Sequence, residues 1–170
     1  DFDNYLKDKK LVLTGFFYPI LQKHKKQIIE IMFLYLYDKK PISIGYSGGK
    51  DSSVALDITL KALLLIKEIY GAQRLQKKSF VLFSDTLMEL DPVINGIYES
   101  LDNVRMFCNK HNLNVQVEQV SPELKNTFWS LVLGKGYILP NQKNRYCSER
   151  LKVKKKKKEI ERILSSYEGF

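Results

Sequence analysis

Apolar residues recur along this chain at two different spacings, which predict strands and helices in alternation. Short apolar runs between proline, glycine or serine are typical of buried strands, and apolar residues at every third or fourth position are typical of helices. Strand-like runs occupy residues 42–46, 79–84 and 113–120, the last alternating with polar residues. Helical spacing occupies residues 21–37, 53–70, 92–111 and 159–167, and residues 121–123 are typical of a further helix start.

This order of elements predicts an α/β fold. Consecutive parallel strands need a crossover between them, usually a helix, and helices then cover both faces of the sheet. We therefore expect a three-layer α/β/α sandwich with a mostly parallel sheet, in which residues 113–120 lie nearer an edge. Residues 41–170 would form this single domain, and residues 1–40 would be a helical segment packed on it.

Composition indicates a basic protein and favours a reducing compartment. The chain has 170 residues, a formal net charge of +9 and two cysteines, Cys108 and Cys147. Two cysteines are too few for a disulfide scaffold, which favours the cytoplasm, and no apolar stretch approaches the ~18 residues of a membrane span. A basic balance favours polyanions such as nucleic acid or nucleotides, and a merely basic surface explains it equally well. Because the chain begins at Asp1 rather than Met, we expect an upstream segment.

A glycine-rich loop follows the first predicted strand and precedes a helix. Its sequence, Ser-Gly-Gly-Lys-Asp-Ser-Ser, occupies residues 47–53. Glycines allow backbone N–H groups to converge on one anion, and the N-terminal end of the next helix adds positive potential. The serine hydroxyls can donate to phosphate oxygens, Lys50 supplies a cation, and Asp51 either caps the helix or holds Mg²⁺. The loop is not a Walker A motif, because only three residues separate Gly45 from Gly49 and an aspartate follows the lysine.

A second polar cluster, Ser84-Asp85-Thr86, follows the second predicted strand. Ligands of parallel α/β sheets bind beyond the carboxyl ends of the strands. We therefore expect this cluster and the glycine loop to converge on one crevice. The alternatives are plain structural roles, with the loop as a tight turn and Asp85 as the cap of the next turn.

The glycine loop, between its strand and its helix, resembles the PP-loop of the ATP pyrophosphatase superfamily. That superfamily includes PAPS reductases, argininosuccinate and GMP synthetases, and tRNA thiolation enzymes. The resemblance implies an adenine-nucleotide α-hydrolase-like fold that binds ATP and cleaves it between the α and β phosphates. Residues 83–86 resemble the segment that borders the nucleotide in PAPS-reductase-like proteins. The blocks 126–129, 134–137 and 145–152 resemble the DndC family of DNA phosphorothioation proteins and its single-strand counterpart SspD.

The narrower resemblance implies an enzyme of DNA sulfur modification that uses ATP and Mg²⁺. A DNA backbone phosphate would attack the α-phosphate of ATP and release pyrophosphate, after which sulfur would displace AMP. The partners would be DNA and other sulfur-modification proteins, including a cysteine desulfurase as sulfur donor. The catalytic candidates are Lys50, Asp51 and Arg145. The candidates for binding the nucleotide are Tyr46, Ser47, Gly48, Gly49, Lys50, Asp51, Ser52, Ser53, Ser84, Asp85, Thr86, Gly136 and Lys152.

Cys147 marks a departure from the family pattern. It lies between Arg145 and Arg150, whose charges favour a thiolate, and its counterpart in DndC-like proteins belongs to a set of cysteines associated with a [4Fe–4S] cluster. Such a cluster needs four cysteines, and this chain has two. Either the others follow in a longer chain, of which this one is a C-terminally truncated part, or this member has no cluster. The family's proline after Lys152 is replaced by the lysine run 154–158, which is either a solvated face or a join across absent residues.

Three other interpretations stay open. A PAPS-reductase-like enzyme needs a redox cysteine in a mobile C-terminal tail, and no cysteine follows Cys147. A tRNA thiolation enzyme would use the same adenylation on RNA. A non-catalytic chain would be a nucleic-acid-binding subunit with a vestigial nucleotide loop. Elsewhere, Phe128 and Trp129 are more typical of a core than of a base-stacking platform, and Cys108 is typical of a small buried hydrophobe.

Overall fold

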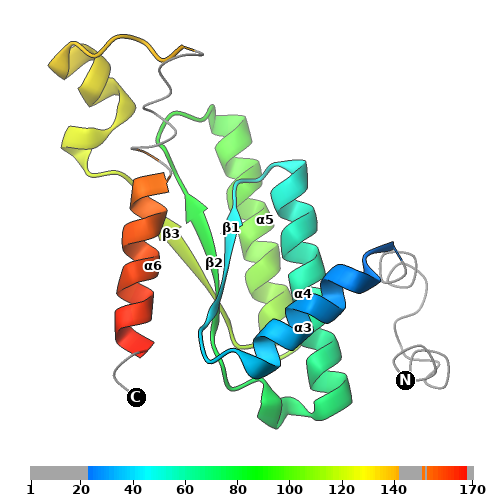
Figure 1. Ribbon diagram of the computed structural model, residues 1–170. Coiled ribbons are helices and arrows are strands. Elements are labelled where there is room, and N and C mark those ends of the chain that lie inside the picture. Colours follow the sequence, from blue (N-terminus) through cyan, green and yellow to red (C-terminus); the bar gives the residue numbers. More distant parts are fainter. Residues whose placement is uncertain (1–22, 142–150, 152, 168–170) are drawn as a thin grey trace.

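The computed structural model describes residues 23–141, 151 and 153–167 (Figure 1). Its helices and strands, in chain order, are α3 (Lys25–Tyr37), β1 (Ile42–Tyr46), α4 (Lys50–Tyr70), β2 (Ser79–Ser84), α5 (Asp91–Lys110), β3 (Val115–Val120) and α6 (Lys154–Tyr167). Shorter turns lie between them: the 3₁₀ turns η1 (Ala72–Arg74) and η2 (Leu124–Asn126), and the π-helical turn η3 (Ser130–Gly134). None of the helices in this part of the chain is long and apolar enough to cross a membrane.

The strands form one parallel sheet with β2 in the middle. Ile44 pairs with Val81, and Val81 pairs with Val117, so the carboxyl ends of β1, β2 and β3 lie along the same edge. β2 is buried along its whole length, as expected for a strand covered on both faces. The structure confirms the α/β class, the parallel sheet and the edge position of β3. Assignment to a three-layer sandwich of the adenine-nucleotide type stays a prediction.

The two faces of β2 pack against different helices. Val81 and Phe83 join the main core with side chains of α3, α4 and α5. Phe80 and Leu82 point the other way and pack against Ile163 of α6, as the alternation of side chains along a strand requires. Figure 1 accordingly has α4 and α5 on one side of the sheet and α6 on the other.

α6 runs opposite to the strands, so its N-terminal end lies toward their carboxyl ends (Figure 1). An ion pair fixes this end: Nζ of Lys155 lies 3.5 Å from Oε1 of Glu123, which comes just after β3. α6 begins at Lys154, earlier than the residue 159 that apolar spacing predicts, because lysine is itself a good helix former. The lysine run is therefore the first part of a continuous helix.

Two further elements differ from the sequence prediction. α4 begins at Lys50 rather than at residue 53, because the carbonyl of Gly49 already accepts the N–H of Ser53 at 3.0 Å. The helix predicted after residue 121 begins later: residues 124–126 form the 3₁₀ turn η2, and residues 128–135 form a short helical stretch that contains η3. There the hydroxyl of Ser130 donates to the carbonyl of Leu124 at 2.6 Å, and such side-chain bonds compete with regular helix formation.

α3 packs on α4 and contributes Ile28, Met32 and Tyr35 to the main core. The predicted division into residues 1–40 and 41–170 stays a prediction, and residues 1–22 lie outside the described part of the chain. Cys108 is buried in the same core, as predicted.

Two aromatic residues near η3 behave differently from each other. Phe128 is buried, as predicted, but the prediction for Trp129 is wrong, since 57% of that residue is exposed. The two rings meet edge to face with centroids 5.1 Å apart. Trp129 therefore covers Phe128 from outside instead of entering the core.

Candidate functional site

The loop between β1 and α4 depends on glycine at one position in particular. Gly48 has a φ of +74°, which residues with a Cβ rarely adopt. A Cβ added there would also stand 2.5 Å from Cγ1 of Ile97 in α5. The loop therefore packs directly against α5. Gly49 is the N-cap of α4 and places no side chain over the first turn of the helix.

The serines of the loop hold the turn together. The hydroxyls of Ser47 and Ser52 lie 3.1 Å apart. Ser52 and Ser53 both donate to the carbonyl of Gly49, at 2.8 and 3.1 Å. In this structure these hydroxyls therefore close the turn, which is the plain structural role. The groups that the loop presents to an anion are its backbone N–H groups, the N-terminal end of α4 and Lys50.

Lys50 and Asp51 are both exposed in the first turn of α4. The alternative in which Asp51 caps the helix is wrong, because the N-cap residue is Gly49. An acidic residue in the first turn interacts favourably with the helix dipole, so the position of Asp51 stabilises α4. A role of Asp51 in binding Mg²⁺ stays a prediction.

The cluster after β2 is buried around one carboxylate. Asp85 is 4% exposed. Its Oδ1 accepts the N–H of Leu87 at 2.9 Å, and its Oδ2 accepts the hydroxyl of Tyr98 at 2.6 Å and the amide of Gln119 at 3.3 Å. Asp85 thus caps the next turn and also joins β2 to α5 and β3. The hydrogen bond to this carboxylate, with burial and its negative charge, holds the pKa of Tyr98 above its ordinary value.

The other candidates beside this carboxylate have different surroundings. Tyr46 points into the main core and its hydroxyl lies 2.7 Å from Oγ of Ser100, so its side chain is on the α5 side of the sheet. Thr86 donates to Oε2 of Glu89 at 2.7 Å. Ser84 is 6% exposed and its Oγ has no hydrogen-bond partner in the described structure.

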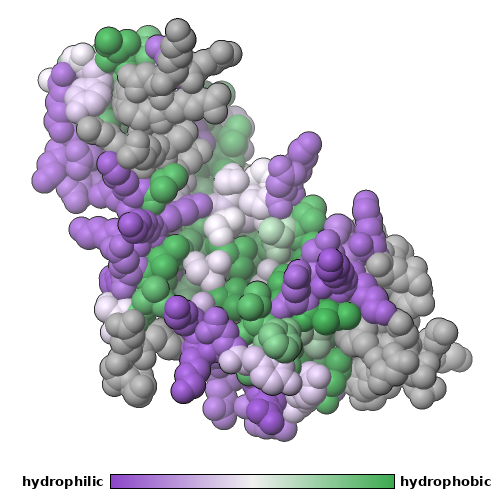
Figure 2. All heavy atoms as spheres, viewed as in Figure 1, coloured by the Kyte–Doolittle hydropathy of each residue, from purple (hydrophilic) through white to green (hydrophobic). Residues whose placement is uncertain are grey.

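The glycine loop and the cluster lie side by side at the carboxyl edge of the sheet. Tyr46 pairs with Phe83, so the residues that follow them, Ser47 and Ser84, leave adjacent strands at the same level. Figure 2 has pale and hydrophobic residues over this part of the molecule, between the hydrophilic surfaces of α6 and α3. The two clusters therefore leave adjacent strands at one edge of the sheet, and the crevice on which they were expected to converge stays a prediction.

Three of the predicted site residues, Arg145, Cys147 and Lys152, lie outside the described residues. Gly136 has a φ of +65° in the exposed segment after η3. No described atom lies within 4 Å of a Cβ added at Gly136.

Sequence reasoning missed the two partners of the buried carboxylate, Tyr98 and Gln119. Gln119 stands next to the carboxyl end of the third predicted strand. The rule that polar residues at such ends form the site, which identified Asp85, therefore also applies to Gln119. Tyr98 lies in the middle of α5 among alternating polar and apolar residues, and no local pattern marks it.

The described residues do not fit an iron–sulfur cluster. Among them no group of three or more histidine, cysteine or acidic side chains is arranged to hold a metal ion. Burial raises the pKa of the Cys108 thiol to about 11, which makes it a poor ligand and a poor nucleophile. No step of the chemistry below therefore involves a cluster.

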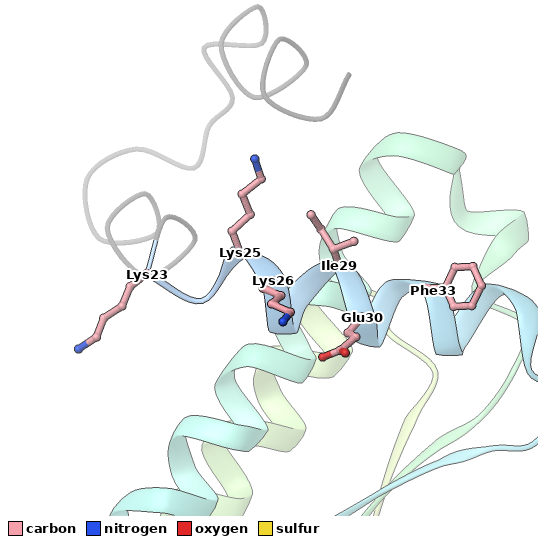
Figure 3. Close-up of a pocket in the computed structure, with 6 residues that line it drawn as sticks. All are labelled: Lys23, Lys25, Lys26, Ile29, Glu30 and Phe33. Carbon is pink, nitrogen blue, oxygen red and sulfur yellow. The ribbon is translucent and has the colours of Figure 1, made fainter.

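A separate groove follows α3 and encloses about 630 Å³ (Figure 3). It is lined by Lys23, Lys25, Lys26, Ile29, Glu30 and Phe33. None of the predicted site residues lines it, and α3 does not lie at the carboxyl edge of the sheet. We therefore place the candidate site at the glycine loop.

Comparison with known proteins finds similarity to an archaeal protein. "Uncharacterized protein MJ0066" of Methanocaldococcus jannaschii is 34% identical over 123 residues, which are 72% of this chain and 20% of that protein. The chain thus spans about a fifth of the length of the relative it matches. No family model and no solved structure matches the chain. The resemblance to PP-loop enzymes and to the DndC family stays a prediction.

The first prediction concerns the geometry of the loop. Gly48→Ala should lower the free energy of unfolding by about 2–4 kcal/mol, because it combines a strained φ with a steric clash. Gly49→Ala is the matched control: its φ is −79° and its Cβ would stand 3.6 Å from Oγ of Ser47, an ordinary contact. We expect the control to change stability by less than about 1 kcal/mol. Chemical denaturation measures both, and equal losses would contradict the loop geometry.

The second prediction concerns the buried carboxylate. Tyr98→Phe should cost about 1–3 kcal/mol of stability, because it removes a hydrogen bond to a charged group. The pKa of Tyr98 is raised from 10.0, so this contribution is complete below pH 10 and is lost as the pH rises through the folded-state pKa. Urea denaturation of both proteins between pH 7 and 11 should give a constant difference that shrinks above pH 10.

Tyr70→Phe is the control for this experiment, since Tyr70 is exposed at the end of α4. It should leave stability unchanged across the same pH range. A difference between wild type and Tyr98→Phe that is absent at pH 7, or that grows above pH 10, would contradict the role of Tyr98.

Proposed function

We propose that this chain is an ATP-binding domain of the PP-loop type that cleaves ATP between its α and β phosphates. The observation that carries the proposal is the meeting of the glycine loop, the N-terminal end of α4 and the end of β2 at one edge of a parallel sheet. Nucleotides bind at such edges. The adenine-nucleotide α-hydrolase-like sandwich is part of the same proposal.

The reaction requires the protein mainly to position the reacting groups and to neutralise charge. Phosphoryl and nucleotidyl transfer depend on holding the reacting oxygens in line and on neutralising the charge that develops. The backbone N–H groups near Gly49 and the ammonium group of Lys50 supply fixed positive charge. Asp51 is exposed beside them and is a candidate to hold Mg²⁺, which would supply further charge neutralisation.

We further propose that the acceptor is a DNA backbone phosphate. An oxygen of that phosphate attacks the α-phosphorus of ATP, the bond to the β-phosphate breaks, and pyrophosphate leaves. A partner protein of the cysteine desulfurase type supplies persulfide sulfur, which a thiol reductant releases as hydrosulfide. The hydrosulfide then attacks the adenylated DNA phosphorus, a P–S bond forms, and AMP leaves. The formal charge of +9 suits a polyanionic substrate. Arg145 and Lys152 belong to this proposal through the sequence resemblance alone.

One observation favours a second candidate, a nucleic-acid-binding subunit with a vestigial nucleotide loop. The hydroxyls of Ser52 and Ser53 and the oxygens of Asp85 already have partners inside the protein. A loop that keeps its shape by itself needs no nucleotide for folding.

The third prediction separates these candidates. With α-³²P-labelled ATP and Mg²⁺, the protein should release labelled AMP and unlabelled pyrophosphate, faster when DNA and a sulfide donor are present. Lys50→Ala should lower the rate by about 10²- to 10³-fold, the usual effect of removing one group that stabilises the transition state. Lys110→Ala, at the far end of α5, removes an exposed lysine of the same charge and should leave the rate unchanged.

The outcomes differ for each candidate. ATP that binds without any AMP being formed supports the vestigial loop and contradicts the enzyme. Equal rates for wild type and Lys50→Ala contradict the assignment of the glycine loop. Product analysis with single-stranded and duplex DNA identifies which form is the acceptor.

A further inference from the structure

The lysine run at the start of α6 has two different sides. Lys157 points outward, with 76% of its side chain exposed and Nζ 4.0 Å from Oε1 of Glu161. The side chain of Lys155 is only 19% exposed, and it pairs with Glu123 after β3. Lys156 is partly buried as well. The run is therefore not a uniform solvated face.

Lys156 reaches across the open side of β1. Among the described residues, its Nζ is the only heavy atom within 4 Å of a Cβ added at Gly45, at 3.4 Å. Gly45 pairs with Leu82, which faces α6. The ammonium group of Lys156 therefore lies on the α6 side of the sheet, over the backbone of a residue that has no side chain. Ser47 is two positions further along, about 7 Å by the rise of a strand. The ammonium group of Lys156 therefore lies about two strand residues from the start of the glycine loop.

An unpartnered hydroxyl lies on the same side of the sheet. Ser84 is in phase with Phe80 and Leu82, the residues of β2 that pack toward α6, so its side chain points to that face. Its Oγ is buried and has no hydrogen-bond partner in the described structure. Ser79 Oγ shares this property at the amino end of β2. Ser84 differs because it stands at the carboxyl edge, beside the loop.

We propose that Lys156 is the second cation of the phosphate site and makes it selective for a polyphosphate chain over a single phosphate. This inference rests on the proposed nucleotide-binding function. Lys50 flanks the loop from α4 and Lys156 flanks it from α6, so the positive charges stand on two sides of one edge. The N-terminal end of α4 adds to them.

Charge and spacing explain the selectivity. A single phosphate satisfies the backbone N–H groups of the loop and one ammonium group. A triphosphate extends further and carries more negative charge, so it can contact the loop and the second ammonium group at the same time. The second contact strengthens binding of the triphosphate and leaves binding of the monophosphate almost unchanged.

The experiment compares Lys156→Met with Lys157→Met. Methionine keeps most of the apolar stem of lysine and removes its charge, and the two variants change the same net charge on the same helix. Calorimetry or a fluorescent-nucleotide assay gives the affinity of each protein for ATP, inorganic tripolyphosphate and AMP. Lys156→Met should weaken ATP and tripolyphosphate about tenfold and AMP by less than twofold. Lys157→Met should bind all three like wild type, and Lys156→Arg should restore most of the loss.

The possible results separate the inference from the function on which it rests. Wild type that binds ATP, with Lys156→Met binding it equally well, overturns the role of Lys156 and leaves the proposed function standing. Wild type that binds neither ATP nor tripolyphosphate overturns the proposed function itself. A Lys156→Met protein that loses affinity for DNA while keeping its affinity for ATP also overturns the inference, because the lysine would then serve a nucleic acid. Circular dichroism and thermal unfolding of each variant establish that it is folded before binding is compared.

Discussion

The parallel pairing of β1 with β2 is the constraint on which the candidate site depends. A parallel pair brings two carboxyl ends to one edge, and the register of Tyr46 with Phe83 brings the glycine loop level with Ser84. An antiparallel pair, or a slip by one residue, would separate these groups or turn their side chains to opposite faces. The burial of β2 on both faces makes such a slip costly, because Val81 and Leu82 would exchange the helices against which they pack.

The buried carboxylate of Asp85 has a supporting role at this edge. A buried charge is expensive unless donors surround it. Here the donors come from its own turn, from Tyr98 of α5 and from Gln119 of β3. The carboxylate therefore joins the central strand to the helix against which Gly48 also packs. This makes Asp85 a structural support at this edge of the sheet, and a role of Ser84 and Thr86 in contacting a nucleotide stays a prediction.

The sequence predicts the parts of the fold that depend on periodicity. The strands, the crossover helices α4 and α5 and the turn at Gly48 follow from apolar spacing and from glycine between two elements. Tyr98 could not be predicted, because its hydroxyl meets Asp85 only when α5 lies across the edge of the sheet. The late start of the helical stretch at residue 128 could not be predicted either, since the hydroxyl of Ser130 takes the carbonyl of Leu124 that a regular helix would use. The orientation of the Lys156 side chain toward β1 depends on how α6 packs on the sheet, and no local sequence pattern predicts that packing.

Polar groups with and without hydrogen-bond partners distinguish a loop that binds a nucleotide from a vestigial loop. Ser52 and Ser53 bond the loop to itself, so the turn is formed before any ligand arrives and binding need not pay to order it. A vestigial loop would keep that property, because it serves the strand-to-helix connection alone. It would have no reason to keep a buried Ser84 Oγ that has no hydrogen-bond partner in the described structure, since such a hydroxyl costs desolvation without a return in stability. The Ser84 hydroxyl beside the loop is therefore the stronger argument that the edge binds an anion.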